Sequence, residues 1–362
     1  MTVNTSDSWP DRRILDLFGI DLPIIQAPMA GASTAQMAIE VCEAGGLGSL
    51  PCALMAPDQA RQAIEIIRQA TSKPLNLNFF CHTAPKLDDA AVAAWKAKLA
   101  PYYAEQNIDP AAPVPVSNRA PFDDAYCSLV EAYKPAVVSF HFGLPAETLM
   151  KRAKAAGAKV ISSATTVAEA RWLEARGVDA VIAMGAEAGG HQGHFLRENI
   201  AGQIGTLALV PQVVDAVKVP VIATGGIADG RGIAAAFMLG ASAVQLGTAY
   251  LFSPEAQVQP FHRQALRTAE AEDTALTNLF TGRPARAITN RLMREIGPIS
   301  ELAPAFPLAG GALMPLRAKS EPSGSPDFSN MWSGQAARLA RELPAGKLTR
   351  HLAEDALARL GR

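Results

Sequence analysis

The sequence is poor in features that mark several common classes of protein. Four cysteines occur among 362 residues, and no two of them form a Cys-x-x-Cys pair, which argues against a zinc ribbon or a redox dithiol. Lysine and arginine together number 33 against 34 aspartates and glutamates, so the chain lacks the basic field that nucleic acid or anionic lipid requires. We therefore expect no nucleic acid and no membrane surface among its partners.

Targeting and membrane-spanning patterns are also missing. The first residues have no basic stretch that leads into an apolar run, as a signal peptide would. Residues 232–254 carry no charge, but this run contains Ser242 and Gln245 and divides into a helical half and a strand-like half, which indicates buried core. Because reduced thiols are the simplest state of the cysteines, we expect a cytoplasmic protein.

Short β-rich apolar runs, each followed by a segment of helical period, recur along the chain. The composition, 49% hydrophobic and 19% charged, can bury a sizeable core. Eight βα units without another pattern between them predict an α/β fold, a (β/α)8 TIM barrel, in preference to an open doubly wound sheet. The expected strands are residues 24–27, 47–50, 75–79, 137–142, 159–163, 180–184, 219–224 and 243–248.

Unequal spacing of the strands locates an insertion in this barrel. The gap between the third and fourth expected strands is the widest, and it predicts a helical insertion at about residues 83–135. Within it, apolar residues at spacings of three and four predict an amphipathic helix. They are Val92, Trp95, Leu99 and Tyr102.

A second addition follows the barrel. The barrel with its insertion is expected to occupy residues 1–290, and residues 291–362 are expected to form a C-terminal helical extension that packs near the barrel mouth. Proline, glycine and serine mark a loop between helical patterns. The loop is expected at residues 318–330 and the helices at residues 334–342 and 348–360.

The alternation of side chains along a strand predicts which of them face the barrel interior. Apolar residues of the third, fourth and eighth strands should face the helices, Phe142 and Leu246 among them. The residues between them should point inward, where a barrel enzyme carries its chemistry at the carboxyl ends of the strands. They are Asn76, Asn78, Ser139, His141, Gln245 and Gly247.

Glycine turns follow two of the expected strands. Gly225 and Gly226 come after the seventh strand, and Gly247 with Thr248 ends the eighth. Glycine allows backbone N–H groups to approach a ligand closely, and barrels commonly bind phosphate after these two strands. We predict a phosphate site there, with glycine serving only the turn as the alternative.

The loop after the sixth strand, residues 185–194, contains four glycines and two histidines. At a barrel mouth, His191 is predicted to meet a substrate, although a solvated loop histidine is the alternative. No role is predicted for His194 or His82. His262 and His351 follow the eighth strand, where helical surface is expected.

Groups that unaided barrel enzymes use are missing from the strand ends. Lys73, Lys159 and Lys218 lie at or before the starts of strands, at the non-catalytic end, which argues against a Schiff-base mechanism. Glu187 is the one carboxylate in the loops considered, too few for a divalent metal. We therefore expect no metal and a cofactor that performs the difficult chemistry.

Taken together, these segments resemble the nitronate monooxygenase family, formerly called 2-nitropropane dioxygenases, which are FMN-dependent barrels. The resemblance covers nearly the whole chain, and the Gly-Gly-His sequence at residues 189–191 is its most specific part. The matching segments are Gln26-Ala27-Pro28-Met29-Ala30-Gly31, Asn76-Leu77-Asn78-Phe79-Phe80, Ser139-Phe140-His141-Phe142-Gly143, Glu187-Ala188-Gly189-Gly190-His191, Ala223-Thr224-Gly225-Gly226-Ile227 and Gln245-Leu246-Gly247-Thr248.

The resemblance implies an FMN across the barrel mouth. Family members usually carry glutamine where this chain has Met184, and methionine cannot replace its hydrogen bonds, so backbone and van der Waals contact is expected there. A segment with Phe328, Met331 and Trp332 is expected to close over the flavin. The other residues implied in cofactor binding are Ala27, Pro28, Met29, Asn78, Gly189, Gly190, Gly225, Gly226, Gln245, Leu246, Gly247 and Thr248.

The resemblance also implies a reaction. His191 would be the base for neutral nitroalkanes, and His141 would act as an electrostatic partner across the pocket. The physiological substrate would be an alkyl nitronate such as propionate 3-nitronate. It would give one electron to FMN, and the semiquinone and substrate radical would react with O2 to yield a carbonyl compound and nitrite.

Two other functions remain open from the residues alone. One is an FMN-dependent NAD(P)H oxidoreductase acting on quinones or enoyl thioesters, because related flavin barrels bind nicotinamides without a Gly-x-Gly-x-x-Gly motif. The other is a non-catalytic barrel that binds FMN or a sugar phosphate. Such a binder would keep the glycine turns and have no use for His191.

Overall fold

The computed structural model describes residues 8–86, 88–115, 119–197 and 201–362. Its main sheet has eight parallel strands in the order β1-β9-β8-β6-β5-β4-β3-β2, and a bridge between Ile25 and Leu47 brings β1 beside β2. The predicted (β/α)8 barrel is therefore confirmed. The strands are β1 (Ile24–Gln26), β2 (Gly48–Pro51), β3 (Leu75–Phe80), β4 (Val137–His141), β5 (Lys159–Ala164), β6 (Ala180–Met184), β8 (Val221–Thr224) and β9 (Ala243–Leu246).

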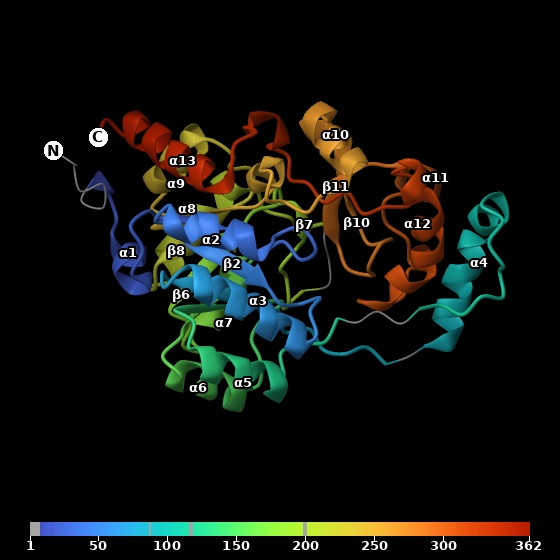
Figure 1. Ribbon diagram of the computed structural model, residues 1–362, viewed down its shortest axis with the longest axis horizontal. Helices are drawn as coiled ribbons and strands as arrows, with labels where there is room; N and C mark the ends of the chain where they lie inside the picture. Colours follow the sequence, from blue (N-terminus) through green and yellow to red (C-terminus); the bar gives the residue numbers. More distant parts are fainter. Residues whose placement is uncertain (1–7, 87, 116–118, 198–200) are drawn as a thin grey trace.

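Helices surround this sheet (Figure 1). The last helix of the chain packs against α9 and α2 and so completes the outer ring beside the eighth barrel strand, β9. It corresponds to the helix predicted at residues 348–360. The ring comprises α2 (Ala35–Glu43), α3 (Pro57–Ala70), α5 (Asp124–Tyr133), α6 (Glu147–Ala155), α7 (Val167–Glu174), α8 (Thr206–Ala216), α9 (Gly230–Met238) and α13 (Ala345–Arg359).

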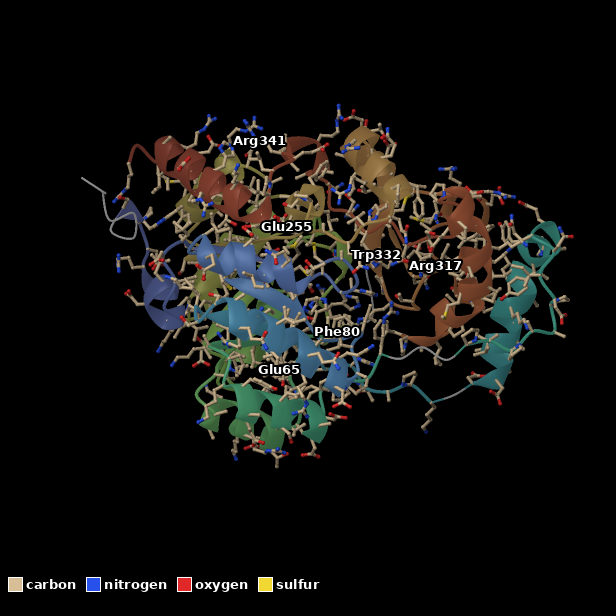
Figure 2. All side chains as sticks on the ribbon, viewed as in Figure 1. Glu65, Phe80, Glu255, Arg317, Trp332 and Arg341 are labelled. Atoms are coloured by element: carbon tan, nitrogen blue, oxygen red, sulfur yellow. The ribbon has the colours of Figure 1, made fainter. Side chains whose placement is uncertain are left out.

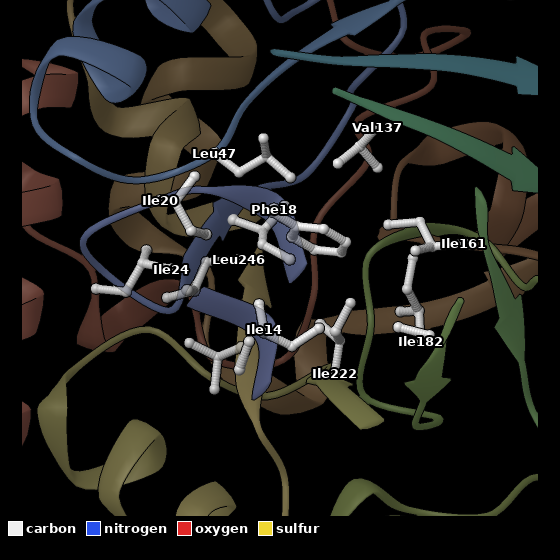
Figure 3. Close-up of a cluster of buried hydrophobic side chains, with 14 of the residues drawn as sticks. Ile14, Phe18, Ile20, Ile24, Leu47, Val137, Ile161, Ile182, Ile222 and Leu246 are labelled. Atoms are coloured by element: carbon white, nitrogen blue, oxygen red, sulfur yellow. The ribbon is translucent and has the colours of Figure 1, made fainter. Parts of the chain in front are cut away.

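An N-terminal helix, α1 (Arg13–Phe18), packs into the main core. Ile14 and Phe18 are almost completely buried, and Figure 3 shows them among strand residues such as Val137, Ile161 and Ile222. These strand residues are themselves fully or almost fully buried. The core therefore extends from the barrel strands to the helices that cover them.

A second apolar cluster lies outside the barrel, where α4 (Asp89–Glu105) meets the C-terminal part of the chain. This outer layer contains the predicted amphipathic helix, which buries Trp95, Leu99 and Tyr102. Trp95 Nε1 donates to the Ala309 carbonyl at 3.0 Å, and Figure 1 shows α4 at the end of the molecule far from α1. The remaining parts of the layer are α11 (Arg291–Ile296), η4 (Leu308–Leu313), α12 (Met314–Ser320) and η5 (Glu321–Ser323).

A small antiparallel sheet, which the sequence did not predict, links the barrel mouth to the outer layer. Strands β10 (Thr274–Thr277) and β11 (Ala285–Ile288) form a hairpin, and β11 pairs with β7 (Gly190–His191). Three short helices precede the hairpin. They are the 3-10 helix η2 (Thr248–Phe252), then α10 (Pro260–Thr268), and then the 3-10 helix η3 (Ala271–Asp273). The histidine loop is thus held at the edge of a second sheet.

Two predictions about local structure are wrong. The helix expected at residues 334–342 is reduced to η6 (Ala337–Leu339), because Gly334 N donates to Thr248 Oγ1 at 2.9 Å and Gln335 N to the Glu187 carbonyl at 3.0 Å. The loop expected at 318–330 still belongs to α12 and η5 as far as Ser323. Hydrogen bonds to the barrel outweigh helical propensity in the first case.

Phe142 does not face the helices as expected. Strand β4 ends at His141, and Phe142 has a positive φ of 72°, which turns its ring out of the strand alternation. The ring lies 5.0 Å from that of Phe80 and 5.4 Å from that of Phe306. Phe142 therefore forms part of an aromatic wall at the barrel mouth.

Candidate active site

A cavity of about 390 Å³ opens at the carboxyl ends of the barrel strands. Leu246 is the one predicted cofactor residue that does not line it, because its side chain is buried in the main core (Figure 3), as the strand alternation predicted. The predicted residues that do line it are Ala27, Pro28, Met29, Asn78, His141, Met184, Gly189, Gly190, His191, Gly225, Gly226, Gln245, Gly247 and Thr248.

The glycine turn after β8 is closely packed in the wall of the cavity. Gly225 and Gly226 have φ values of 108° and 69°, a region that side chains with a Cβ rarely adopt. A Cβ on Gly225 would lie 2.9 Å from Thr206 Oγ1. Thr206 in turn donates its N–H to the Glu187 carboxylate at 2.9 Å, so Glu187 holds Thr206 in place beside the turn.

Gln245 leaves a polar group unsatisfied in the cavity. It lies on β9 and points inward as predicted, and its Oε1 is buried with no hydrogen-bond partner among the described residues. Leaving a buried amide oxygen without a partner costs about 1–3 kcal/mol. A ligand that brings a hydrogen-bond donor to this oxygen would recover that free energy.

His191 lies in the cavity wall with its ring enclosed by aromatic residues. The centre of the Trp332 ring is 5.3 Å from that of His191, and the Phe306 ring is 5.4 Å away. Its Nε2 is 3.0 Å from Thr281 Oγ1. Burial first, and then the charges of Arg119 and Arg283, lower the pKa of His191 well below its ordinary value, so the imidazole is neutral at pH 7.

His141 lies behind the main chain of His191. A carbonyl can only accept, so His141 Nε2 donates to the His191 carbonyl at 3.0 Å, and Nδ1 accepts from Ser163 Oγ at 2.7 Å. Burial lowers the pKa of His141 to about 4. The ring thus carries no charge at pH 7 and has both nitrogens occupied, and any influence it exerts on a ligand passes through the position of His191.

Sequence reasoning missed two arginines that line the cavity. Arg119 comes from the predicted insertion and Arg317 from α12 of the outer layer, where Figure 2 labels it. Burial, followed by the positive charge of Arg317, lowers the pKa of Arg119 to about 10, which leaves it charged at pH 7. Arg317 Nε donates to Glu321 at 2.8 Å, whereas Arg119 forms no ion pair within the described ranges of the chain.

His262 is a further residue that the sequence placed wrongly. It was expected on a helical surface, but on α10 it lines the cavity, and its Nε2 donates to the Trp332 carbonyl at 3.1 Å. Burial lowers the pKa of His262 to about 4. The helical assignment was correct, but the pattern gave no sign that this face of the helix meets the C-terminal segment.

The C-terminal segment contributes one aromatic residue to the cavity. Trp332 lines it (Figure 2), whereas Phe328 is fully buried in the outer layer and Met331 packs in a third apolar cluster with Leu251 and Phe252. Of the three residues expected to close over a flavin, Trp332 is therefore the one that lines the cavity. Trp332 is also bridged to Ala287 of β11.

Neither a metal centre nor a membrane span is found in the part of the chain that the structure describes. No group of three or more His, Cys, Asp or Glu residues there is arranged to hold a metal ion. No helix among the described residues is long and apolar enough to cross a membrane.

Comparison with known proteins identifies the family. The chain is 43% identical to a nitronate monooxygenase from Pseudomonas aeruginosa over 353 residues, covering 95% of this chain and 98% of the relative. It is 42% identical to a nitronate monooxygenase from Paraburkholderia phytofirmans over 352 residues, covering 97% and 96%. The nitroalkane oxidase from Streptomyces ansochromogenes superposes with a TM-score of 0.88 at 41% identity, covering 96% and 99%. The nitronate monooxygenase family model matches residues 11–355, and the chain belongs to that family.

Proposed function

We propose that this protein is an FMN-dependent monooxygenase that oxidises alkyl nitronates of the propionate 3-nitronate type, and neutral nitroalkanes, to a carbonyl compound and nitrite with O2. The observation that carries the proposal is that one cavity combines a neutral histidine with two charged arginines. Such a site suits a small anionic substrate whose anion the histidine can also generate from a neutral precursor.

The residues of the cavity fit an FMN. The strained turn at Gly225 and Gly226 and the second turn at Gly247 and Thr248 would offer backbone N–H groups to a single phosphate. The unpartnered Oε1 of Gln245 would accept a hydrogen bond from the cofactor. When bound there, FMN would supply the redox chemistry of the reaction. Met184, only 7% exposed, lines the cavity and would offer the cofactor van der Waals contact without donating a hydrogen bond.

The substrate anion is bound by the arginines. Arg119 is partly buried and has no carboxylate partner within the described ranges. An unpaired cation that is partly shielded from water is stabilised when a ligand supplies an anion. Arg317 already forms an ion pair with Glu321. A substrate with a carboxylate beside its nitronate group offers two anionic centres to these two cations, which favours the propionate 3-nitronate type.

His191 acts only on the neutral substrates. A nitroalkane must lose an α-proton before it can be oxidised, and the neutral imidazole of His191 accepts it. A nitronate has already lost that proton. His141 holds the main chain of His191 and takes no part in the transfer itself.

Spectra of the purified protein test the proposal. Under anaerobic conditions a nitronate is expected to reduce the bound flavin, whereas NADH and NADPH leave it oxidised. Fast reduction by a nicotinamide, with no response to nitronate, would instead support the NAD(P)H oxidoreductase. A flavin that responds to neither would point to a non-catalytic binder.

A further inference from the structure

The ring of His191 has one nitrogen occupied and one available. Nε2 lies 3.0 Å from the hydroxyl of Thr281, and Nδ1 has no hydrogen-bond partner in the described part of the chain. Figure 2 labels Phe80 and Trp332, whose ring centres are 6.2 Å and 5.3 Å from that of His191 and which line the same cavity. Nδ1 is therefore the nitrogen that a ligand in the cavity can use.

A neutral imidazole carries a single proton, so its position decides whether Nδ1 can act as a base. If the proton is on Nε2, Nδ1 presents a lone pair to the cavity. If it is on Nδ1, the ring can donate a hydrogen bond to a ligand but cannot accept a proton there. The partner of Nε2 selects between these two tautomers.

The surroundings of Thr281 favour the first tautomer. Its hydroxyl is almost completely buried, lies 3.3 Å from the Arg283 carbonyl, and accepts the Arg283 N–H at 3.4 Å. A carbonyl can only accept, so the single hydroxyl proton of Thr281 points to the Arg283 carbonyl. The lone pairs of Oγ1 then accept from His191 Nε2–H and from the Arg283 N–H. Were the hydroxyl to donate to Nε2, the carbonyl would lose this donor and the ring proton would lie on the partnerless Nδ1.

The small sheet keeps Thr281 in place. His191 is paired with Ala285 in the ladder of β7 and β11, and Gln192 N donates to the Pro284 carbonyl at 2.9 Å. These contacts attach the end of the turn between β10 and β11, which carries Thr281, to the histidine loop. The separation of Thr281 from His191 is consequently fixed by backbone hydrogen bonds.

We propose that Thr281 is a positioning residue that holds the proton of neutral His191 on Nε2 and so presents an unprotonated Nδ1 to the substrate. This inference rests on the proposed function for the step it serves. In that step the α C–H bond of a neutral nitroalkane breaks, its electron pair remains on the substrate to form the nitronate, and the proton moves to Nδ1. The resulting imidazolium keeps its Nε2–H on Thr281.

A pair of kinetic assays separates this role from a general loss of structure. Thr281→Val removes the hydroxyl at nearly constant volume and is expected to lower turnover of nitroethane by about 10- to 100-fold, with turnover of ethyl nitronate little changed. Thr281→Ser should restore the nitroethane activity. Thr277→Val is the matched control, because Thr277 is fully buried in the same hairpin and its hydroxyl accepts from Leu279 N at 3.2 Å, away from His191.

The outcomes of these assays are distinct. If Thr281→Val slows both substrates equally, or neither, the inference is overturned while the proposed function stands. If the unmodified protein fails to oxidise ethyl nitronate, the proposed function fails instead.

A spectroscopic measurement tests the tautomer without any activity. In protein labelled with ¹⁵N-histidine, the His191 signals, identified by their loss in His191→Asn, are expected to show a protonated Nε2 and an unprotonated Nδ1. In Thr281→Val, protonated Nδ1 should become populated. A protonated Nδ1 in the unmodified protein would overturn the proposal, including in the event that Thr281→Val does not fold.

Discussion

His141 donates from Nε2 to the main-chain carbonyl of His191 over 3.0 Å. This contact joins the end of β4 to β7, which is the edge strand of the small sheet. Because the ring of His141 also accepts from Ser163, its tautomer is fixed. The two histidines are therefore not equivalent: His141 positions the backbone, and His191 presents its ring to the cavity.

The first prediction concerns the base. His191→Asn should reduce turnover of a neutral nitroalkane by about 10² to 10⁴ and should affect a pre-formed nitronate far less, with flavin content near normal. Steady-state assays with nitroethane and ethyl nitronate measure both. His194→Asn is the control, since His194 lies in the same loop but does not line the cavity. Equal loss with both substrates would mean that His191 binds the anion and is not chiefly a base.

The second prediction concerns the phosphate turn. Gly225→Ala places a Cβ 2.9 Å from Thr206 Oγ1 at a φ of 108°, so the turn must shift and the FMN content of the purified protein should fall severalfold. The ratio of flavin to protein absorbance, with the released cofactor identified by mass, measures this. Gly177→Ala is the control, because Gly177 has a φ of 81° but no atom within 4 Å of the added Cβ. Normal flavin in Gly225→Ala would place the phosphate elsewhere.

The third prediction concerns substrate charge. Arg119→Gln should raise KM for propionate 3-nitronate by about 10-fold or more, as expected for loss of a charge-assisted hydrogen bond, and leave KM for ethyl nitronate nearly unchanged because it lacks the carboxylate. Arg176→Gln is the control, since this guanidinium stacks on Trp172 at 3.8 Å and does not line the cavity. A parallel rise for both substrates would indicate that Arg119 contacts the nitronate group.

The sequence predicted the barrel well because its signals are local. Each strand is a short apolar run with a fixed alternation, so Asn78, His141 and Gln245 were correctly placed inside from spacing alone. Glycine turns and the Gly-Gly-His loop follow the strands directly. Nearly all residues predicted in the site accordingly line one cavity.

What the sequence did not reveal depends on contacts between distant segments. Arg119 and Arg317 are separated by almost two hundred positions, yet both line the cavity, and α4 of the insertion packs on η4 of the C-terminal part. Thr281 reaches His191 through the pairing of β11 with β7, a strand of two residues that no periodicity can mark. The orientation of Phe142 was predicted wrongly because the backbone is left-handed at Phe142, directly after β4. Phenylalanine carries no local signal for that conformation.

The fourth prediction concerns acid stability. Burial, and then the charge of Arg283, lowers the pKa of His82 from 6.5 to about 4 in the folded protein. Between these two pH values, unfolding therefore takes up a proton at His82. The contribution of His82 to the free energy of unfolding is constant above pH 6.5 and falls by about 1.4 kcal/mol per pH unit as the pH drops from 6.5 towards 4. His82→Phe, whose ring can pack against Phe306 as the imidazole does at 4.8 Å, should reduce that slope by one proton.

Urea denaturation at several values between pH 5 and pH 7 measures the slope. His141, His194 and His262, with pKa values also lowered to about 4, add to it in both proteins, and the comparison isolates the contribution of His82. The same slope in His82→Phe and in the unmodified protein would show that His82 titrates normally in the folded state.

The outer layer has a consequence for partial unfolding. It carries Arg317, and its own cluster is separate from the main core to which the barrel strands belong. Units with separate cores can open independently. An opening confined to the outer layer would leave the glycine turns, and the cofactor proposed to bind there, in place while removing Arg317, which is proposed to bind the substrate. Such a molecule would keep its flavin absorbance and lose its selectivity among substrates. Faster hydrogen exchange in α4 than in β4 would reveal this opening.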